Sequence, residues 1–367
     1  MPQPRGLLGL LGLLACAPLL LADWPSFRGN PLQDGVAQSQ LPEQLVELWR
    51  VTKKDSFEST AAIVGPHVIV GCLDNSVYCF RLADGQEVWA ASTGGTNGIK
   101  ASPAVVAGRV FVGDQDGVFH CLSAETGKKI WSQTTEGEIT SSAVVVGDRV
   151  LVGSYDEHLY CFQAADGKLL WKVKTDGPIN CSPAVVEGRT FVAGCDSTLR
   201  IIEVATGKEL GQVDLKGQAG ASPAIAGDLL FVGNMDRTFL AIDWRQAAVK
   251  WEYEPARAFP FYSSAAVGDD VVVVGGRDRR IHAIDRQTGM ERWTFQTRQR
   301  VESSPVIVGQ RVYCGSSDGT LYGLNLKTGK QEWAQPLGSA VTASPSIAQG
   351  RLVIGTVDGL LFCFGSR

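Results

Sequence analysis

A repeat of about forty residues constrains this chain of 367 residues more than any other feature. One position of the repeat holds Trp in seven copies, at steps of 40, 42, 40, 80, 42 and 40 residues, and Gly211 divides the step of 80. The seven are Trp49, Trp89, Trp131, Trp171, Trp251, Trp293 and Trp333. A fixed period of this length indicates a fold built by repetition of one small unit.

Two further positions keep the same period. Asp occupies the first in all eight copies, at Asp74, Asp116, Asp156, Asp196, Asp236, Asp278, Asp318 and Asp358. The second carries a hydroxyl, at Thr60, Ser102, Ser142, Ser182, Ser222, Ser264, Ser304 and Ser344. Three ladders with one period identify eight copies of the unit, because chance does not align them.

Each copy has the composition of four short strands. In residues 101–134, β-branched runs are separated by the pairs Ala107-Gly108, Asp116-Gly117 and Thr126-Gly127, which are typical of tight turns between antiparallel strands. One such sheet cannot cover its own faces and must stack on its neighbours. We therefore predict an all-β, eight-bladed β-propeller of four-stranded antiparallel blades. An open solenoid would instead need capping repeats at both ends.

The two ends of the repeat region complement each other. Leu45 to Thr52 carries the first Trp without three preceding strands, whereas Ser344 to Phe364 supplies three strands without a Trp strand. Pairing them completes one blade and leaves no open ring edge. We therefore predict one propeller over residues 45–367, closed by the N-terminal strand and preceded by an extension over residues 23–44.

The first 22 residues have the pattern of a secretory signal. One Arg precedes an apolar run, interrupted by Gly and Pro, that ends near Ala22, and cleavage there leaves Asp23 first. A membrane-spanning helix is the competing interpretation. Residues 13–16, Leu-Leu-Ala-Cys, also resemble a lipobox, and membrane association is expected only if Cys16 is lipidated. We expect an exported monomer in the periplasm or cell envelope, with an outer-membrane lipoprotein as the alternative.

Composition excludes some partners and favours a packed core. The chain is 44% hydrophobic, so disorder is not expected. Lys and Arg number 34 against 38 Asp and Glu, with no basic block, so nucleic acid is not an expected partner. The four His fall in different copies, so no zinc site is predicted.

The repeated positions have structural interpretations. We expect the Trp side chains to be buried between successive blades, and the Asp to bond backbone amides in a turn. A Gly four residues before the Trp suits a turn of positive φ, and this pattern lapses at Ala247. Cys181 and Cys195 lie at the open ends of one predicted hairpin, so a disulfide between them is an open alternative in an oxidising compartment.

The segments 124–131, 287–293 and 327–333, which read AETGKKIW, QTGMERW and KTGKQEW, resemble the tryptophan-docking motif of PQQ-type propellers. The resemblance covers residues 45–364. Residues 23–36 are also similar to the start of many PQQ-like repeat proteins of planctomycete and verrucomicrobial bacteria. The family contains calcium- and PQQ-dependent dehydrogenases and non-catalytic scaffolds similar to BamB, the outer-membrane assembly lipoprotein.

The sequence departs from the dehydrogenase branch. It lacks the adjacent Cys pair that many such enzymes place against the quinone, a haem CxxCH motif, and room for the loops of a quinone pocket. We therefore expect no enzyme activity and neither PQQ nor calcium. The resemblance instead implies a BamB-like scaffold that binds envelope or outer-membrane proteins. The alternatives are a PQQ-dependent dehydrogenase-like quinoprotein that oxidises an alcohol or sugar, and a polysaccharide-binding module.

Two longer loops, 94–100 and 255–262, lie four blades apart and should face each other across one mouth of the ring. The candidate partner-binding residues on that face are Lys100, Arg257, Phe259, Phe261, Tyr262 and Glu302. The alternative for the two Phe is that they fold back onto a blade edge. Residues 237–311 hold eleven Arg and one Lys against nine acids, which favours an acidic partner. The residues two before each hydroxyl position should ring the same mouth.

Overall fold

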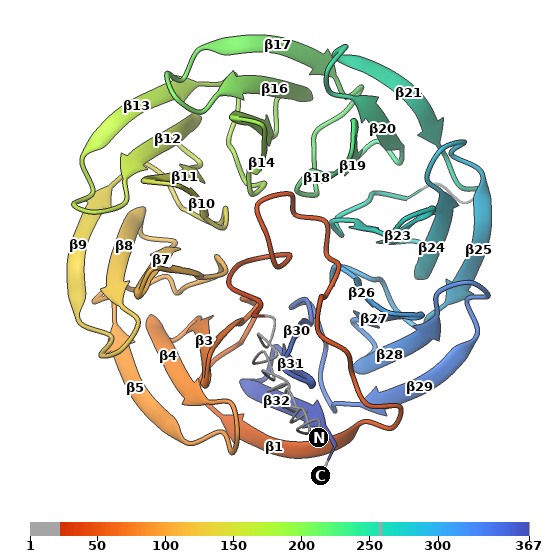
Figure 1. Cartoon of the computed structure of the whole chain (residues 1–367), viewed down its shortest axis with the longest axis horizontal. Helices are drawn as coiled ribbons and strands as arrows, with labels where there is room; N and C mark the ends of the chain where they lie inside the picture. Colours follow the sequence, from red (N-terminus) through yellow and green to blue (C-terminus); the bar gives the residue numbers. More distant parts are fainter. Residues whose placement is uncertain (1–22, 257–258, 367) are drawn as a thin grey trace, which may run out of the picture.

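The computed structural model describes residues 23–256 and 259–366, and every element in them is a strand. Figure 1 shows eight sheets arranged in a ring. Each sheet has four strands paired in an antiparallel order, so the predicted all-β, eight-bladed propeller is confirmed. No helix in these two ranges is long and apolar enough to cross a membrane. The expectations for the leader and Cys16 fall on residues 1–22, outside the described part of the chain.

The blades follow the chain order around the axis. Blade 1 contains β2 (Ala62–Val64), β3 (His67–Cys72), β4 (Ser76–Arg81) and β5 (Glu87–Ser92). Blade 2 contains β6 (Ala104–Val106), β7 (Arg109–Gly113), β8 (Val118–Ser123) and β9 (Lys129–Thr134). Blade 3 contains β10 (Val144–Val146), β11 (Arg149–Gly153), β12 (His158–Gln163) and β13 (Leu169–Lys174). Blade 4 contains β14 (Ala184–Val186), β15 (Arg189–Ala193), β16 (Thr198–Glu203) and β17 (Glu209–Asp214).

The second half of the ring repeats the same arrangement. Blade 5 contains β18 (Ala224–Ala226), β19 (Leu229–Gly233), β20 (Phe239–Asp243) and β21 (Ala248–Tyr253). Blade 6 contains β22 (Ala266–Val267), β23 (Val271–Gly275), β24 (Arg280–Asp285) and β25 (Glu291–Gln296). Blade 7 contains β26 (Val306–Val308), β27 (Arg311–Gly315), β28 (Thr320–Asn325) and β29 (Gln331–Pro336). Blade 8 contains β30 (Ser346–Ala348), β31 (Arg351–Gly355), β32 (Leu360–Gly365) and β1 (Val46–Thr52).

Blade 8 closes the ring with strands from both ends of the chain. Strand β1 pairs antiparallel with β32, from Val46 opposite Gly365 to Thr52 opposite Leu360. Closure by the N-terminal strand therefore agrees with the prediction from the incomplete terminal repeats. It removes the two sheet edges that an open ring would expose.

Tryptophan side chains fix the contact between successive blades. The Trp131 indole Nε1 donates a hydrogen bond to the Ala164 carbonyl of the next blade at 3.2 Å. Its ring lies against Gly167, where φ is 76° and a Cβ atom would come within 2.7 Å of the ring. The other indoles with the same bond pair Trp49 with Leu82, Trp89 with Ala124, Trp171 with Val204, Trp251 with Arg286 and Trp293 with Leu326.

One interface replaces this arrangement. In blade 4 the Trp position of the repeat holds Gly211, and in blade 5 the turn-Gly position holds Ala247. These two positions face each other, so both departures from the repeat pattern lie at the contact between blades 4 and 5. Trp244, which is 1% exposed, belongs to the apolar cluster of this contact and packs edge-on against Phe191. Its Nε1 donates to the Gly227 carbonyl at 2.9 Å. A buried tryptophan from a different position of the repeat therefore packs at the interface of blades 4 and 5.

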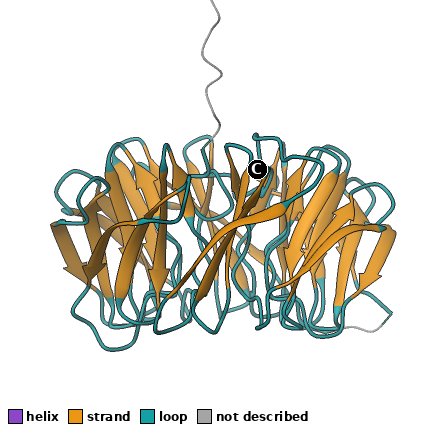
Figure 2. Cartoon of the chain, turned by 90° about the horizontal axis from the view of Figure 1, so that it is seen from below, coloured by secondary structure: helices purple, strands orange, loops and turns teal. Residues whose placement is uncertain are grey.

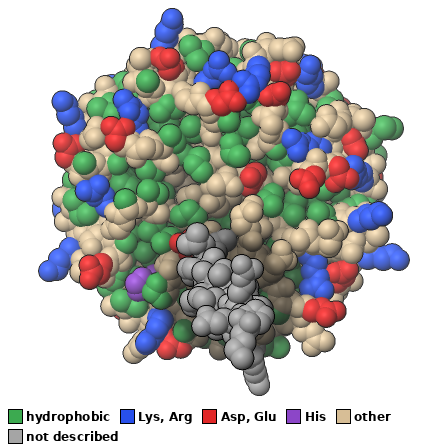
Figure 3. Space-filling view, viewed as in Figure 1, with side chains coloured by type: hydrophobic (Ala, Val, Ile, Leu, Met, Phe, Trp, Pro, Cys, Tyr) green, Lys and Arg blue, Asp and Glu red, His purple; other side chains and the backbone are tan. Residues whose placement is uncertain are grey.

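The N-terminal extension crosses the axis on the face seen in Figure 1. Carbonyl groups of the extension accept hydrogen bonds from the innermost strands of six blades. The donor and acceptor pairs are Ile63 with Trp24, Val105 with Pro25, Val185 with Pro31, Ile225 with Leu32, Val267 with Asp34, and Ile307 with Gly35, at 2.7 to 2.9 Å. We call this the extension face. Figure 3 shows that hydrophobic side chains occupy much of its centre, whereas charged side chains gather toward its periphery.

The opposite face carries the loops that join the fourth strand of each blade to the next blade, and we call it the loop face. Figure 2 shows these loops below the ring, with the C-terminus near the extension face above. Arg28, in the extension, is fully buried and donates from Nη2 to the Ala265 carbonyl at 2.7 Å. Burial lowers the pKa of this guanidinium to about 10. The extension is thus packed into the ring rather than laid over it.

Candidate functional site

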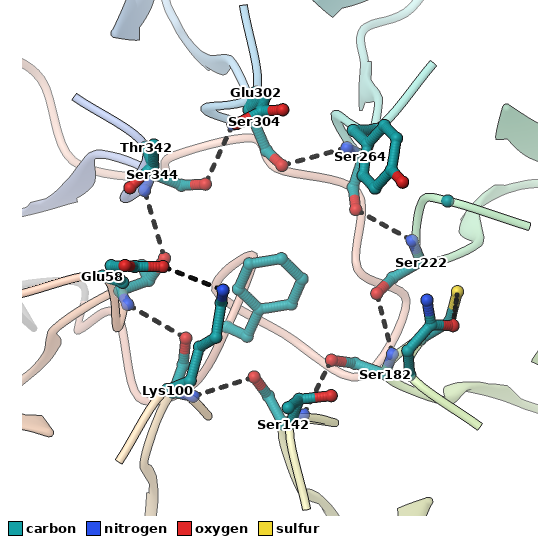
Figure 4. Close-up of a pocket in the computed structure, with 18 of the residues that line it drawn as sticks. Glu58, Lys100, Ser142, Ser182, Ser222, Ser264, Glu302, Ser304, Thr342 and Ser344 are labelled. Carbon is teal, nitrogen blue, oxygen red and sulfur yellow. Dashed lines mark hydrogen bonds and ion pairs between the residues drawn. The ribbon is translucent and has the colours of Figure 1, made fainter. Parts of the chain in front are cut away.

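The hydroxyl ladder forms a closed ring of hydrogen bonds around the axis (Figure 4). In each blade the backbone N–H of the hydroxyl position donates to the side-chain oxygen of the same position in the next blade. The pairs are Thr60 with Ser102, Ser102 with Ser142, Ser142 with Ser182, Ser182 with Ser222, Ser222 with Ser264, Ser264 with Ser304, Ser304 with Ser344, and Ser344 with Thr60, at 2.8 to 3.3 Å. The last pair joins the final repeat to the first.

A cavity of about 350 Å³ lies on the axis and is lined by all eight hydroxyls. We call it the axial pocket. The residues two before each hydroxyl also line it, namely Glu58, Lys100, Thr140, Asn180, Gly220, Tyr262, Glu302 and Thr342. Phe27 reaches the pocket from the extension, and Gln115, Glu138, Tyr155 and Cys181 complete the wall. The repeat places one polar position of every blade at one mouth, because all eight connecting loops end there.

Ion pairs neutralise most of the charge at this mouth. The Lys100 Nζ atom lies 3.0 Å from a Glu58 carboxylate oxygen. The Arg277 guanidinium donates to Glu302 at 2.5 Å and stacks over the Tyr262 ring, 3.6 Å from its centroid. Lys100, Tyr262 and Glu302 thus share one mouth, as the sequence placed them. Arg277 was not singled out from the sequence, although the arginine excess of residues 237–311 includes it.

The aromatic loop before blade 6 divides its residues between core and surface. Phe261 is fully buried and packs edge-on against Phe239 and His282, with ring centroids 5.7 Å apart in each case. Its interpretation as a partner-contacting residue is therefore wrong, because it fills the space between blades 5 and 6. Phe259 is 50% exposed and remains available. Arg257 lies outside the described residues.

A signal for Phe261 was present in the repeat. It occupies the position three before the hydroxyl, and that position is apolar and buried in every copy. The other members are Phe57, Ile99, Ile139, Ile179, Ala219, Val301 and Val341. Comparison across the copies therefore assigns Phe261 to the core.

The loop at residues 94–100, on the opposite side of the ring, is held in place by the Asp116 carboxylate. Backbone N–H groups of Thr96 and Asn97 donate to Asp116 at 2.7 and 3.0 Å, and the Asn97 amide donates to its other oxygen at 2.7 Å. These bonds, led by that of the Asn97 backbone, lower the pKa of Asp116 below its ordinary value. Gly-rich sequence at residues 94–100 therefore forms an anchored loop.

Arginines gather on the loop face over blade 6 and its connection to blade 7. We call Arg277, Arg279, Arg298 and Arg300 the arginine sector. Arg279 and Arg298 are exposed and form no ion pair with any residue in the described ranges, whereas Arg300 lies 3.3 Å from Glu302. A cavity of about 710 Å³ is lined by Arg277, Arg279 and Arg300 of the sector together with Lys100, Glu58 and Glu302. The sector presents positive charge beside an open groove.

The cysteines at the predicted hairpin ends are both free thiols. The disulfide alternative for Cys181 and Cys195 is therefore not realised in the structure. Cys181 Sγ lies 3.8 Å from the Ala219 carbonyl, so its side chain packs toward blade 5. Burial raises the pKa of both thiols.

The carboxylates Glu58 and Glu302 of the axial pocket are held in ion pairs. Within residues 23–256 and 259–366, no three His, Cys, Asp or Glu side chains come together in a way that would hold a metal ion. The pocket carboxylates Glu58 and Glu302 already face Lys100 and Arg277. A cation would have to displace these partners to bind there.

The family model described as "Outer membrane protein assembly factor BamB" matches residues 47–141, 73–178, 120–258 and 255–364. Together these matches span nearly all eight blades. No curated protein shows significant sequence similarity to the chain.

Solved structures with the same fold include proteins of different kinds. BamB from Moraxella catarrhalis has a TM-score of 0.76 at 16% identity, over 88% of this chain and 98% of that one. The quinohemoprotein alcohol dehydrogenase from Comamonas testosteroni has a TM-score of 0.82 at 14% identity, over 94% of this chain and 81% of that one. A europium-containing methanol dehydrogenase has a TM-score of 0.79 at 14% identity, over 94% and 98%. At these identities the similarity establishes the fold, and function has to be argued from the site.

Proposed function

The chain belongs to the family of the outer membrane protein assembly factor BamB, and on this premise we propose that it is an exported, non-enzymatic scaffold that binds envelope proteins. Its binding surface is the loop face. Lys100, Phe259, Tyr262 and Glu302 contribute to it together with the arginine sector. Neither PQQ nor calcium takes part.

The observation that carries this proposal is the unbalanced charge of the arginine sector. Arg279 lines the 710 Å³ groove and Arg298 precedes the lining residue Gln299, and both side chains are exposed without an acidic partner among the described residues. The loop face at the connection between blades 2 and 3 has the opposite character, because Glu136 and Glu138 are exposed there without a cationic partner in the described ranges, whereas the exposed Asp176 beyond them faces Arg200. A partner with an acidic segment gains by docking over blades 6 and 7 and is repelled on the other side, so the charge pattern sets its orientation.

The extension face is a weaker candidate for this role. Its centre is occupied by the chain's own residues, and the innermost strands there already donate to the extension. A protein segment would have to displace the extension to add to those strands. Within the described ranges, no segment of the chain crosses the axis on the loop face.

Charge reversal tests the proposal. The full chain with Arg279→Glu and Arg298→Glu should lose envelope proteins that co-purify with the wild type from membranes. The control is Lys128→Glu with Lys330→Glu, which reverses two exposed cations in hairpin turns on the extension face. Equal recovery of the same partners by both double variants would refute docking at the arginine sector.

The structural neighbours raise a quinoprotein dehydrogenase as the second candidate, because two of them are alcohol or methanol dehydrogenases. Titration of the full chain with PQQ and calcium distinguishes the two. The scaffold proposal expects no saturable change in quinone absorbance and no alcohol-dependent dye reduction. A stoichiometric absorbance change would favour the quinoprotein.

A further inference from the structure

The axial pocket holds hydrogen-bonding groups that the protein itself leaves unused. Each ring hydroxyl accepts one backbone N–H, and the proton of that hydroxyl is not needed for the ring. The buried Thr342 hydroxyl oxygen, in the same wall, has no hydrogen-bond partner in the part of the chain that the structure describes, and the Thr140 hydroxyl has only the Tyr155 side chain beside it. Buried polar atoms are costly when unpaired, so the wall is chemically suited to a ligand that brings many hydroxyls of its own.

Aromatic side chains complement these polar groups. Phe27 is partly exposed and enters the pocket from the extension, so an apolar ring lies among hydroxyls. Tyr155 and Tyr262 add aromatic surface at the wall. Aromatic rings offer an apolar face to C–H groups, while hydroxyls and amides satisfy O–H groups. A sugar ring presents both kinds of group at once.

Charge argues for a neutral ligand. The cations nearest the pocket, Lys100 and Arg277, each face a carboxylate, and Glu138 has only the amide of Gln115 at 3.4 Å. Arg300 also lies 3.3 Å from Glu302, so each of the three cations at the mouth already faces a carboxylate. An anion would lose solvation there without gaining a free cation.

Shape and backbone chemistry argue against a peptide. The extension crosses one end of the axis (Figure 1), so ligands enter from the loop face. A peptide commonly binds by adding to a free strand edge. The innermost strand edges already donate to the extension, for example Val105 to Pro25 and Ile225 to Leu32. The volume of about 350 Å³ is at the lower end of the range for small-molecule sites.

We propose that the axial pocket binds one terminal unit of a neutral saccharide, with Phe27 as the stacking surface and the Ser and Thr ring as the hydrogen-bonding wall. The extension crosses the other end of the axis, so a polysaccharide would insert a chain end from the loop face. The site depends on Phe27 and the ring hydroxyls, which are not part of the arginine sector, although it shares Glu302 with the lining of the neighbouring groove. Failure of saccharide binding and failure of protein binding can therefore be distinguished by experiment.

Ligand-observed NMR on the full chain tests the assignment with three neutral disaccharide probes: maltose, cellobiose and di-N-acetylchitobiose. At least one of the three disaccharides should show saturable transfer of magnetisation from the protein. Phe27→Ala should weaken that binding about tenfold, which corresponds to about 1.4 kcal/mol. Thr140→Val keeps the side-chain shape, removes one hydroxyl and should weaken binding severalfold. The matched control Phe259→Ala removes an exposed ring on the same face and should leave affinity unchanged.

Additional probes separate the remaining possibilities. Retention of the protein on insoluble amylose or chitin, competed by the soluble disaccharide, would assign the site to a polymer end, whereas binding of the disaccharide alone would assign it to free sugar. The proposal is overturned if none of the three disaccharides saturates, if Phe27→Ala and Phe259→Ala behave alike, or if triglycine or sulfate saturates the pocket instead. Thermal unfolding of each variant verifies that the ring is intact, and Thr140→Val decides the result if Phe27→Ala is unfolded.

Discussion

Replacing Gly167 by alanine should destabilise the propeller at the contact between blades 2 and 3. Gly167 has a φ of 76°, so any side chain there costs about 1 to 2 kcal/mol in backbone strain. A Cβ atom would also lie 2.7 Å from the Trp131 ring, about 1 Å closer than an ordinary carbon contact. The ring must then retreat, and such overpacking costs about 1 to 3 kcal/mol more. The expected total is about 2 to 5 kcal/mol.

Gly188 provides the matched control. It has a φ of 71° in a turn on the same face, and a Cβ atom there would meet nothing within 4 Å. Gly188→Ala therefore carries the strain without the collision. Equilibrium unfolding in urea measures both variants, and the difference between them isolates the contact with Trp131. In a Trp131→Leu background that difference should shrink. Equal losses for the two alanine variants in the wild-type background would refute the idea that the indole is packed against the turn.

Three other perturbations address separate parts of the ring. Thr60→Val leaves the buried N–H of Ser344 unpaired and should cost about 1 to 3 kcal/mol in urea unfolding, whereas Thr60→Ser should be nearly neutral. Trp244→Ala leaves a cavity in the apolar cluster at the interface of blades 4 and 5 and should cost about 3 to 5 kcal/mol, measured in the same way. Asp116→Asn should destabilise the chain at neutral pH. Because folding depresses the pKa of this carboxyl below 3.8, its contribution is present above that pH and is lost as pH falls through the folded pKa, so the two proteins should converge in acid unfolding.

The repeat was sufficient to predict the architecture because its sequence signals are local and recur in eight copies. Turn pairs, the Trp step and the two incomplete ends were enough to predict eight blades and closure through β1 and β32. The closed ring of hydroxyls was not predicted, since a sequence ladder does not show which neighbouring atom each side chain faces. Phe261 was wrongly assigned to the binding surface because the prediction rested on the composition of its loop and not on its position in the repeat.

The path of the N-terminal extension could not be predicted from the repeat. Residues 23–44 have no internal period, and their path is set by tertiary bonds such as those from Val185 to Pro31 and from Val267 to Asp34. Burial of Arg28 beneath the ring carries no local sequence signal either, because an isolated Arg in a polar segment ordinarily remains solvated. The floor of the axial pocket is therefore a product of the folded ring.

The extension, which crosses one end of the axial pocket, also brings the two proposed sites to the same face of the ring. With the extension across one end of the axis, the pocket opens toward the same loop face that carries the arginine sector, and Glu302 belongs to both linings. Arg277 joins them further, because it stacks on Tyr262 at the pocket mouth while its charge faces Glu302. A protein docked over blades 6 and 7 would displace or share these contacts, so its presence changes the mouth through which a saccharide enters. Two ligands on one face then influence each other through Arg277 and Glu302, and by linkage the effect of each on the other is equal.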